Sequence, residues 1–423
     1  MTPRRVLSPC LRFVLLLGIV SLFCLPVRAE PAAPWPVRQR ARHLEQLGVF
    51  PWHAAGQHGR RLKIAVLDSG FAGYRDQLGK ALPARVTLRS FRWDGNLEAK
   101  DSQHGVLCAE AVHALAPDAE LLLVNWEPQH PGQFLDAVRW AVKEGARIVT
   151  CSIIMPTWSD GEGGGPVHAE LSRLLGEDSG PAGVLFFACA GNTADRHWRG
   201  PFTDAGAGWH SWEERCTDNA ILPWNNGRVS VELCARQDLD LELCVEDTTL
   251  GREVRHCRVA SGDYHCAVVR FEPMSGHGYR ARVRATGSRT GPFHLFVLGG
   301  GLGCARSGGS IPFPGDGPEV VTVGAVDEEG CRTSYSSCGP NSSRPKPDLV
   351  ARVPFPSLFR PRPFTGTSAA APQAAGLAAL LWAQHPDWTA DRVRRALRES
   401  ALDLGPRGHD WETGHGLIRL PAP

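Results

Sequence analysis

Short apolar runs alternate with helix-like segments over the first half of the chain. The apolar runs at 63–67, 120–125, 147–153 and 184–190 are typical of buried strands, and the stretches near 104–115, 133–144 and 166–176 are typical of helices. Strand, helix and strand at this spacing predict a parallel sheet with helices on both faces. In such sheets the functional residues gather beyond the carboxyl ends of the strands.

The pattern changes between residues 201 and 302, where no helical period is found. Short alternating runs follow one another there, separated by turn residues, at 229–235, 240–245, 264–271, 279–285 and 293–298. This alternation predicts an antiparallel β-sandwich. The α/β pattern resumes at 319–323 and ends with helices at 367–384 and 388–400. We therefore expect one discontinuous α/β domain, made of residues 30–200 and 303–423, with the sandwich inserted into it.

Residues 1–29 have the pattern of a secretory signal. Basic residues at Arg4, Arg5 and Arg12 precede an apolar run over 13–25 that is too short for a comfortable membrane span. Small residues before position 30 favour cleavage after Ala29. The sequence thus predicts a secreted or periplasmic protein with no membrane span in the mature chain.

Charge and cysteine content indicate which partners the protein can bind and which of its cysteines can pair. The 423 residues carry a net charge of +2, and without residues 1–29 there are 42 basic and 44 acidic side chains. No basic excess is left to bind phosphates, which argues against a nucleic-acid partner. Eleven of the 13 cysteines follow the signal, and three of them, Cys108, Cys151 and Cys189, lie on predicted core elements and are expected to be buried free thiols. An odd number predicts at least one free thiol, while pairs within the insert, or Cys331 with Cys338, stay open.

Four short motifs lie at predicted strand ends or helix starts. Asp68 follows a strand, His104 opens a helix, Asn192 follows another strand, and Ser368 opens a helix of small residues. Taken singly, each has an ordinary interpretation as a turn residue, a helix cap or a surface side chain.

Taken together and in this order, the four motifs resemble the subtilisin-like serine proteases, the subtilases. The matching segments are Ile64–Gly70, His104–Gly105, Ala188–Asn192 and Gly366–Ser368 with Pro372. The resemblance covers about residues 45–192 and 310–420. It implies a three-layer domain built on a parallel sheet, and a hydrolase that cuts peptide bonds.

The resemblance also implies a role for each motif residue. A serine hydroxyl needs a neighbouring base to become a nucleophile, and imidazole titrates near neutral pH. His104 would take the proton of Ser368, and Asp68 would orient the imidazole and stabilise its charged form. Asn192 and the backbone N–H of Ser368 would bind the oxyanion.

Three further residues are expected to line the substrate cleft: Ser152, Ile154 and Gly366. The family normally has Ser-Leu-Gly where this chain has Ser152, Ile153 and Ile154, so we expect an altered fit for an extended peptide. About thirty residues separate Ala29 from the first strand, fewer than a typical family prodomain. We therefore expect the enzyme to fold unaided or with a partner.

The insert, residues 201–302, itself resembles a pre-peptidase C-terminal (PPC-type) sandwich. Asp238, Asp240 and Asp247 could ligate calcium, although turn formation is the stronger expectation for aspartates at such places. Four tryptophans are expected to pack the insert against the main domain or to line a binding surface: Trp198, Trp209, Trp212 and Trp224. A protein partner or a glycan at the insert stays open.

The sequence thus predicts an exported serine endopeptidase acting on a protein or peptide substrate. No cofactor is required for this chemistry, no metal ligand set is predicted, and a structural calcium ion has no direct support. Two alternatives stay open. The chain could be a catalytically silent homologue that acts by binding, or a different hydrolase such as an esterase or a peptide cyclase.

Overall fold

A parallel sheet forms the centre of the protein. The computed structural model describes residues 35–423 except 100–101, 177–178, 215, 226 and 261–264, so the predicted signal at 1–29 lies outside the described residues. Within the described part, seven strands pair in the order β16-β15-β5-β4-β1-β3-β2, and each pairing is parallel. The strands are β1 (Lys63–Asp68), β2 (Thr87–Ser90), β3 (Glu120–Asn125), β4 (Ile148–Cys151), β5 (Leu185–Cys189), β15 (Val321–Val326) and β16 (Leu349–Arg352).

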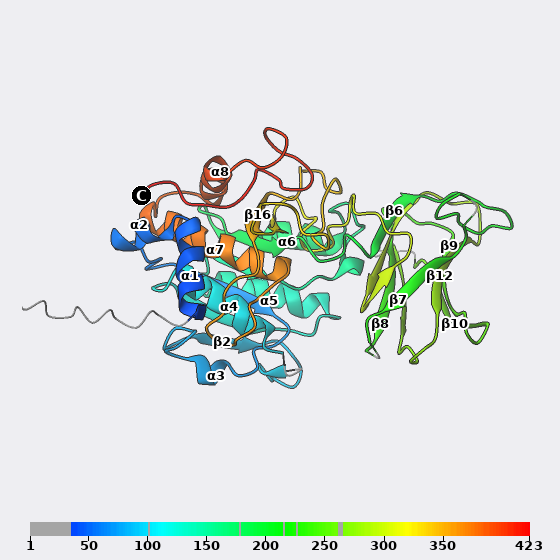
Figure 1. Ribbon diagram of the computed structural model, residues 1–423, viewed down its shortest axis with the longest axis horizontal. Helices are drawn as coiled ribbons and strands as arrows, with labels where there is room; N and C mark the ends of the chain where they lie inside the picture. The colour runs from blue at the N-terminus through cyan, green and yellow to red at the C-terminus, as the bar shows by residue number, and fades with distance from the viewer. Residues whose placement is uncertain (1–34, 100–101, 177–178, 215, 226, 261–264) are drawn as a thin grey trace, which may run out of the picture. The chain divides into compact units, whose positions relative to one another are not determined.

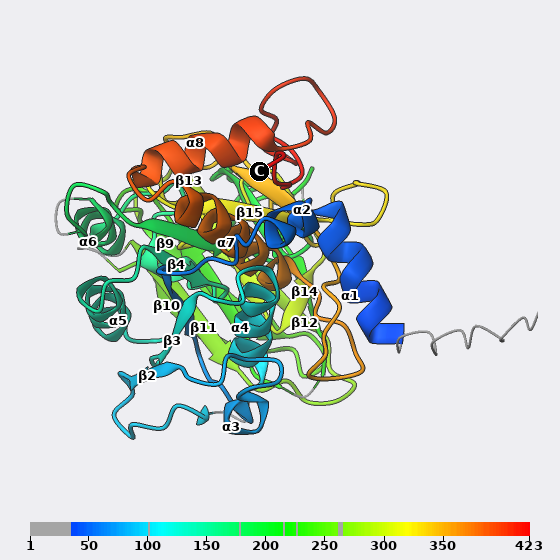
Figure 2. The same ribbon diagram turned by 90° about the vertical axis from the view of Figure 1, so that its left-hand side faces the viewer.

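Helices cover both faces of this sheet, as the apolar pattern predicts. The helices are α1 (Trp35–Gln46), α2 (Val49–Ala54), α3 (Tyr74–Gln77), α4 (His104–Leu115), α5 (Pro131–Lys143), α6 (Pro166–Leu175), α7 (Thr367–Gln384) and α8 (Ala390–Ser400). Ile64 and Val66 of β1 face a core shared with α4 and α7, whereas Ala65 and Leu67 face the core of α5 and α6. Figure 2 shows α5 and α6 together on one side of the sheet. The predicted three-layer α/β class is confirmed.

Helix α7 is buried along almost its whole length and packs directly against α4. The helix contains no charged residue, in keeping with a position inside the protein. A Cβ atom on Gly376 would lie 2.7 Å from the Cβ of Leu115, so a glycine is needed where the two helices touch. This contact fixes the helix that begins at the predicted nucleophile against the helix that begins at the predicted base.

Two antiparallel sheets follow β5 and return the chain to β15. Among the described residues, one sheet has the strand order β10-β9-β12-β7-β14 and the other β11-β8-β13-β6 (Figure 1). Their strands are β6 (His197–Pro201), β7 (Asn219–Pro223), β8 (Val229–Cys234), β9 (Leu241–Asp247), β10 (Arg252–Arg258), β11 (Cys266–Phe271), β12 (Tyr279–Ala285), β13 (Pro292–Leu298) and β14 (Gly300–Leu302). Strand β6 begins at His197, so the sheets take in four residues before the expected boundary at 201.

The inner faces of the two sheets share a core of their own. Trp198 and Trp212 lie in this core rather than against the main domain, which corrects the expectation for these two side chains. Trp224 is 61% exposed. The eleven described cysteines are all free thiols, and Cys108, Cys151 and Cys189 are buried, as their positions on core elements predict. No helix in the described ranges is both long and apolar enough to cross a bilayer.

Candidate active site

Asp68 and His104 form a close pair at the carboxyl end of β1. Asp68 is fully buried, and its Oδ2 lies 2.6 Å from Nδ1 of His104, the first residue of α4. The other carboxylate oxygen accepts a 2.8 Å hydrogen bond from the backbone N–H of Ser69. With both oxygens held, the carboxylate fixes the proton of His104 on Nδ1 and leaves Nε2 to act as the base.

The charge state of His104 is set by two opposing effects. Burial disfavours the imidazolium, but the Asp68 carboxylate outweighs this and raises the pKa of His104 well above its ordinary value. The side chain is still 29% exposed, so it lies within reach of a substrate.

Ser368 is the second residue of α7 and lies beside Ser152, which follows β4. The Ser368 hydroxyl donates to the carbonyl of Ser152 at 3.3 Å, and the Ser152 hydroxyl donates to the carbonyl of Ser368 at 3.1 Å. In the part of the chain that the structure describes, no hydrogen bond joins Ser368 to His104. Catalytic hydrogen bonds are often long without substrate and shorten when it binds.

Asn192 lies three residues after β5, and its amide is oriented by Thr367. Oδ1 of Asn192 accepts from the backbone N–H of Thr367 at 3.0 Å and from its hydroxyl at 2.9 Å. Since the oxygen is taken by two donors, the Nδ2 group is left to donate elsewhere. A Cβ on Gly366, whose φ is +86°, would lie only 2.9 Å from Nδ2. Glycine therefore keeps the space around this donor open.

The thiol of Cys108 lies directly beside the Asp68–His104 pair. Its Sγ is 3.8 Å from Oδ2 of Asp68 and 3.9 Å from Nδ1 of His104, and burial raises the pKa of the thiol. Among the described residues, these three form the one group whose potential metal-ligating atoms all lie within 4.8 Å of one another. The burial of Cys108 was predicted, but its contact with Asp68 and His104 was not. A spacing of four residues from His104 on one helix could have indicated that the two side chains lie close together.

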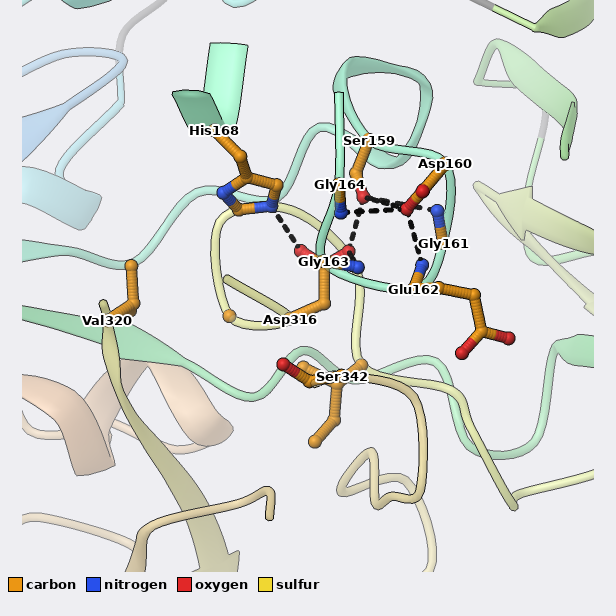
Figure 3. A network of polar contacts seen from close by, with 12 residues as sticks. Ser159, Asp160, Gly161, Glu162, Gly163, Gly164, His168, Asp316, Val320 and Ser342 are labelled. Carbon is orange, nitrogen blue, oxygen red and sulfur yellow. Dashed lines mark hydrogen bonds and ion pairs between the residues drawn. The ribbon is translucent and has the colours of Figure 1, made fainter. Parts of the chain in front are cut away.

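The glycine-rich loop after Trp158 is folded around two aspartates (Figure 3). Oδ1 of Asp160 accepts from the backbone N–H groups of Glu162 and Gly164, each at 2.8 Å. The buried Asp316 accepts from Gly163 N–H at 3.1 Å and lies 2.8 Å from Nε2 of His168. The loop is thereby anchored to α6 and to the segment that leads into β15.

Glu162 points out of this network and holds the inserted sandwich (Figure 3). Its carboxylate accepts from Nε of Arg199 on β6 at 2.8 Å and from Nε2 of His294 on β13 at 3.1 Å. His294 also lies 3.0 Å from His197, whose other nitrogen donates to the Arg306 carbonyl. Burial lowers the pKa of His197 well below its ordinary value, and a neutral His197 that donates from Nδ1 offers its Nε2 as an acceptor to His294.

The three aspartates considered for calcium have other partners. Asp247 accepts from the turn amides of Thr249 and Leu250, and Asp240 binds Arg289. Asp238 lies 2.7 Å from His265. Each carboxylate is therefore committed to a separate turn or ion pair.

Part of the chain matches a family of known proteins. Residues 258–416 match the model of the subtilase family, Peptidase_S8. Ser368 and Gly366 fall within that match, whereas Asp68, His104 and Asn192 precede it. Over this part, a little more than a third of its length, the chain is similar to the subtilases.

Two curated relatives show how far along the chain the sequence similarity reaches. The chain is 33% identical to Subtilisin amylosacchariticus of Bacillus subtilis subsp. amylosacchariticus over 123 residues, 29% of this chain and 31% of the relative. It is 32% identical over 113 residues to the halolysin-like extracellular serine protease Nep of Natrialba magadii, 26% of this chain and 20% of the relative. The matches thus span a third or less of these relatives.

A solved structure resembles this protein over a much greater length. The CspB protease of Clostridium perfringens superposes with a TM-score of 0.63, covering 90% of this chain and 97% of that one, at 14% sequence identity. At this identity the similarity concerns the fold alone. It extends over the greater part of the chain, including regions that the curated relatives do not match.

Proposed function

We propose that this protein is a subtilase, an exported serine endopeptidase that hydrolyses peptide bonds through an acyl-enzyme. The observation that carries the proposal is the 2.6 Å contact between Asp68 Oδ2 and His104 Nδ1, which leaves Nε2 of His104 as a base. Asn192 supports it with an amide whose oxygen is already bound, so that the N–H group is free to donate. The extracellular relative and the predicted signal support export.

The chemical steps follow from these residues. As the Ser368 oxygen attacks the substrate carbonyl carbon, its proton passes to Nε2 of His104. The oxyanion that forms accepts hydrogen bonds from Asn192 Nδ2 and from the N–H of Ser368, at a helix N-terminus whose dipole also favours negative charge. His104 then gives its proton to the leaving amine, which leaves an acyl-enzyme. A water molecule, deprotonated by His104, cleaves the ester and restores Ser368.

A silent binding protein is the second candidate, and one contact favours it. The Ser368 hydroxyl donates to Ser152 rather than to His104. If this bond persisted with substrate present, the hydroxyl would not be activated. Product masses, in turn, distinguish peptide hydrolysis from an esterase or a cyclase.

Active-site labelling separates an activated serine from a silent one. The purified protein is treated with a fluorophosphonate and weighed intact, beside Ser368→Ala, His104→Ala and the control Ser172→Ala on α6. The proposal expects a single adduct on the unchanged protein and on the control, and none on the other two. Folded protein without an adduct would contradict the proposal and favour the binding role.

A further inference from the structure

A groove of about 360 Å³ lies between the catalytic domain and the inserted sandwich. One wall is the segment 154–158, and the other is built by the sandwich. The residues that line the groove include Ile154, Arg228, Glu232, Arg270 and Gly299. The groove exists only because the sandwich is inserted at this point of the chain.

The catalytic wall of the groove begins next to the nucleophile. Ser152 exchanges hydrogen bonds of 3.1 and 3.3 Å with Ser368, and Ile154 follows it by two residues. Two residues of extended chain span at most about 7 Å. A peptide whose scissile bond lies at Ser368 can therefore place one of its nearby side chains in the groove.

The sandwich wall is joined to the oxyanion residue. Arg196 donates from Nε to the carbonyl of Asn192 at 2.5 Å, and its guanidinium lies 4.4 Å from the ring centre of Trp224. The backbone N–H of Trp224 donates to the carbonyl of Gly299 at 3.2 Å, and Gly299 lines the groove. A continuous line of contacts thus runs from Asn192 through the sandwich to the groove.

The charge of the groove favours an anionic side chain. Arg228 and Arg270 line it and are 67% and 44% exposed, whereas Glu232 is 5% exposed. The nearest carboxylates are 3.8 Å from Arg228 and 3.7 Å from Arg270, beyond hydrogen-bond distance, and no shorter ion pair of either is found among the described residues. The carboxylate near Arg270 is the buried Glu232, which the hydroxyl of Ser230 already binds at 2.7 Å, and the one near Arg228 is the exposed Glu272. Both guanidinium groups therefore keep N–H donors for an anionic ligand.

Both walls are held in place before any ligand arrives. Glu162 ties the glycine-rich loop to β6 and β13, and that loop is itself anchored on Asp316 (Figure 3). The thiol of Cys234 on β8 donates to the carbonyl of Pro156 at 3.4 Å, which joins the two walls directly. A groove that is already formed loses little conformational entropy when a ligand binds, which favours binding.

We propose that this groove is a substrate subsite in which Arg228 and Arg270 of the inserted sandwich bind an aspartate or glutamate side chain of the peptide. Because Ile154 of the groove follows Ser152 by two residues and Ser152 contacts Ser368, we expect that acidic residue close to the scissile bond. The sandwich then acts as a specificity wall of the cleft. This inference rests on the proposed endopeptidase function.

Cleavage of a peptide library tests the subsite. A proteome-derived peptide library is digested by the unchanged protein and by Arg228→Glu/Arg270→Glu, and the residues on both sides of each cut are read by mass spectrometry. We expect acidic residues to be enriched close to the cut, and the double variant to lower that enrichment about tenfold, the effect of one charge pair. Arg252→Glu/Arg258→Glu on β10, at the edge of the five-stranded sheet, makes the same charge change and is expected to keep the original profile.

A binding measurement tests the same subsite without turnover. Ser368→Ala protein is immobilised, and the library is passed over it with and without the Arg228→Glu/Arg270→Glu change. Acidic peptides are expected to be retained only by the protein that keeps both arginines, and equal retention by both proteins overturns the subsite. Failure of the proposed function would instead show as missing cleavage and a missing fluorophosphonate adduct, whatever the retention.

Discussion

Arg40 of the first helix donates to Glu110 of α4 at 2.7 Å, although 70 residues separate them. The same carboxylate accepts from the backbone N–H of Leu358 at 2.6 Å and from the hydroxyl of Ser357. Helix α1, the helix that begins at His104 and the segment that leads to Ser368 are thus joined at one buried group. The N-terminal helix is a structural part of the catalytic domain.

Removing Arg40 should destabilise the fold. Arg40→Ala leaves a buried carboxylate without its cation, which costs about 3 kcal/mol of unfolding free energy. Arg42→Ala, on the same helix with an exposed side chain, should change it by less than about 0.5 kcal/mol. Urea unfolding followed by circular dichroism measures both. Equal effects for the two variants would mean that the Arg40–Glu110 pair contributes no net stability.

Labelling of Ser368 should slow as the pH is lowered. This decline should begin at a higher pH than the ordinary pKa of a histidine would give. Because Asp68 raises the pKa of His104, the imidazole stays protonated to a higher pH and cannot accept the serine proton there. The rate constant for fluorophosphonate labelling should therefore rise with pH through this raised pKa. Asp68→Asn should slow labelling by about 10⁴ and move the acid limb to lower pH. A limb at the same pH in both proteins would contradict the role of Asp68.

Gly366→Ala should impair catalysis by displacing the oxyanion donor. The new Cβ would lie 2.9 Å from Asn192 Nδ2, and we expect kcat to fall by about 10² with little change in KM. Gly408→Ala is the matched control, because Gly408 has a similar φ of +90° but no heavy atom within 4 Å of its Cβ position. Peptide hydrolysis followed against substrate concentration gives both constants. A loss of the same size in the control would assign the effect to backbone strain alone.

The protein should lose stability below pH 6.5 through the buried His197. Burial lowers the pKa of His197 well below its ordinary value, so below pH 6.5 the unfolded chain binds a proton that the folded chain does not. One such group lowers stability by up to about 1.4 kcal/mol per pH unit. Melting temperatures of the unchanged protein and of His197→Gln between pH 7 and pH 5 should show a shallower slope for the variant. His256→Gln should instead make the slope steeper, because Glu253 raises the pKa of the exposed His256 and that histidine therefore stabilises the folded state at low pH.

The main sheet and the position of the site residues could be predicted because their signals are local. Strands β1, β3, β4 and β5 are continuous apolar runs, and the carboxyl edge they share is where Asp68, Ser152 and Asn192 lie. Strand β2 was missed because its side chains are largely exposed at the sheet edge, and β10 for the same reason. Exposed edge strands show no apolar alternation to detect.

The contacts between distant segments could not be predicted. Glu110 is the one acidic residue of the otherwise largely apolar helix α4, and the structure buries it against Arg40 and Ser357. The docking of Glu162 on His294 joins residues 132 positions apart. Cys108 was placed in the core, yet its neighbours Asp68 and Ser368 come from other elements. A single sequence holds no signal for such pairings.

The position of the insert in the chain also affects which part of the proposed site is synthesised last and which strand pairing closes late. Strand β15 pairs with β5 across the whole inserted sandwich, with Val321 opposite Phe187, and Ser368 follows later still. Pairings between such distant parts of a chain form slowly, because a long loop must close first. Synthesis from the N-terminus also produces Asp68, His104, Asn192 and the inserted sandwich before it reaches Ser368. A chain whose synthesis has not yet reached Ser368 therefore lacks the nucleophile that we propose, even when the other proposed site residues are already present.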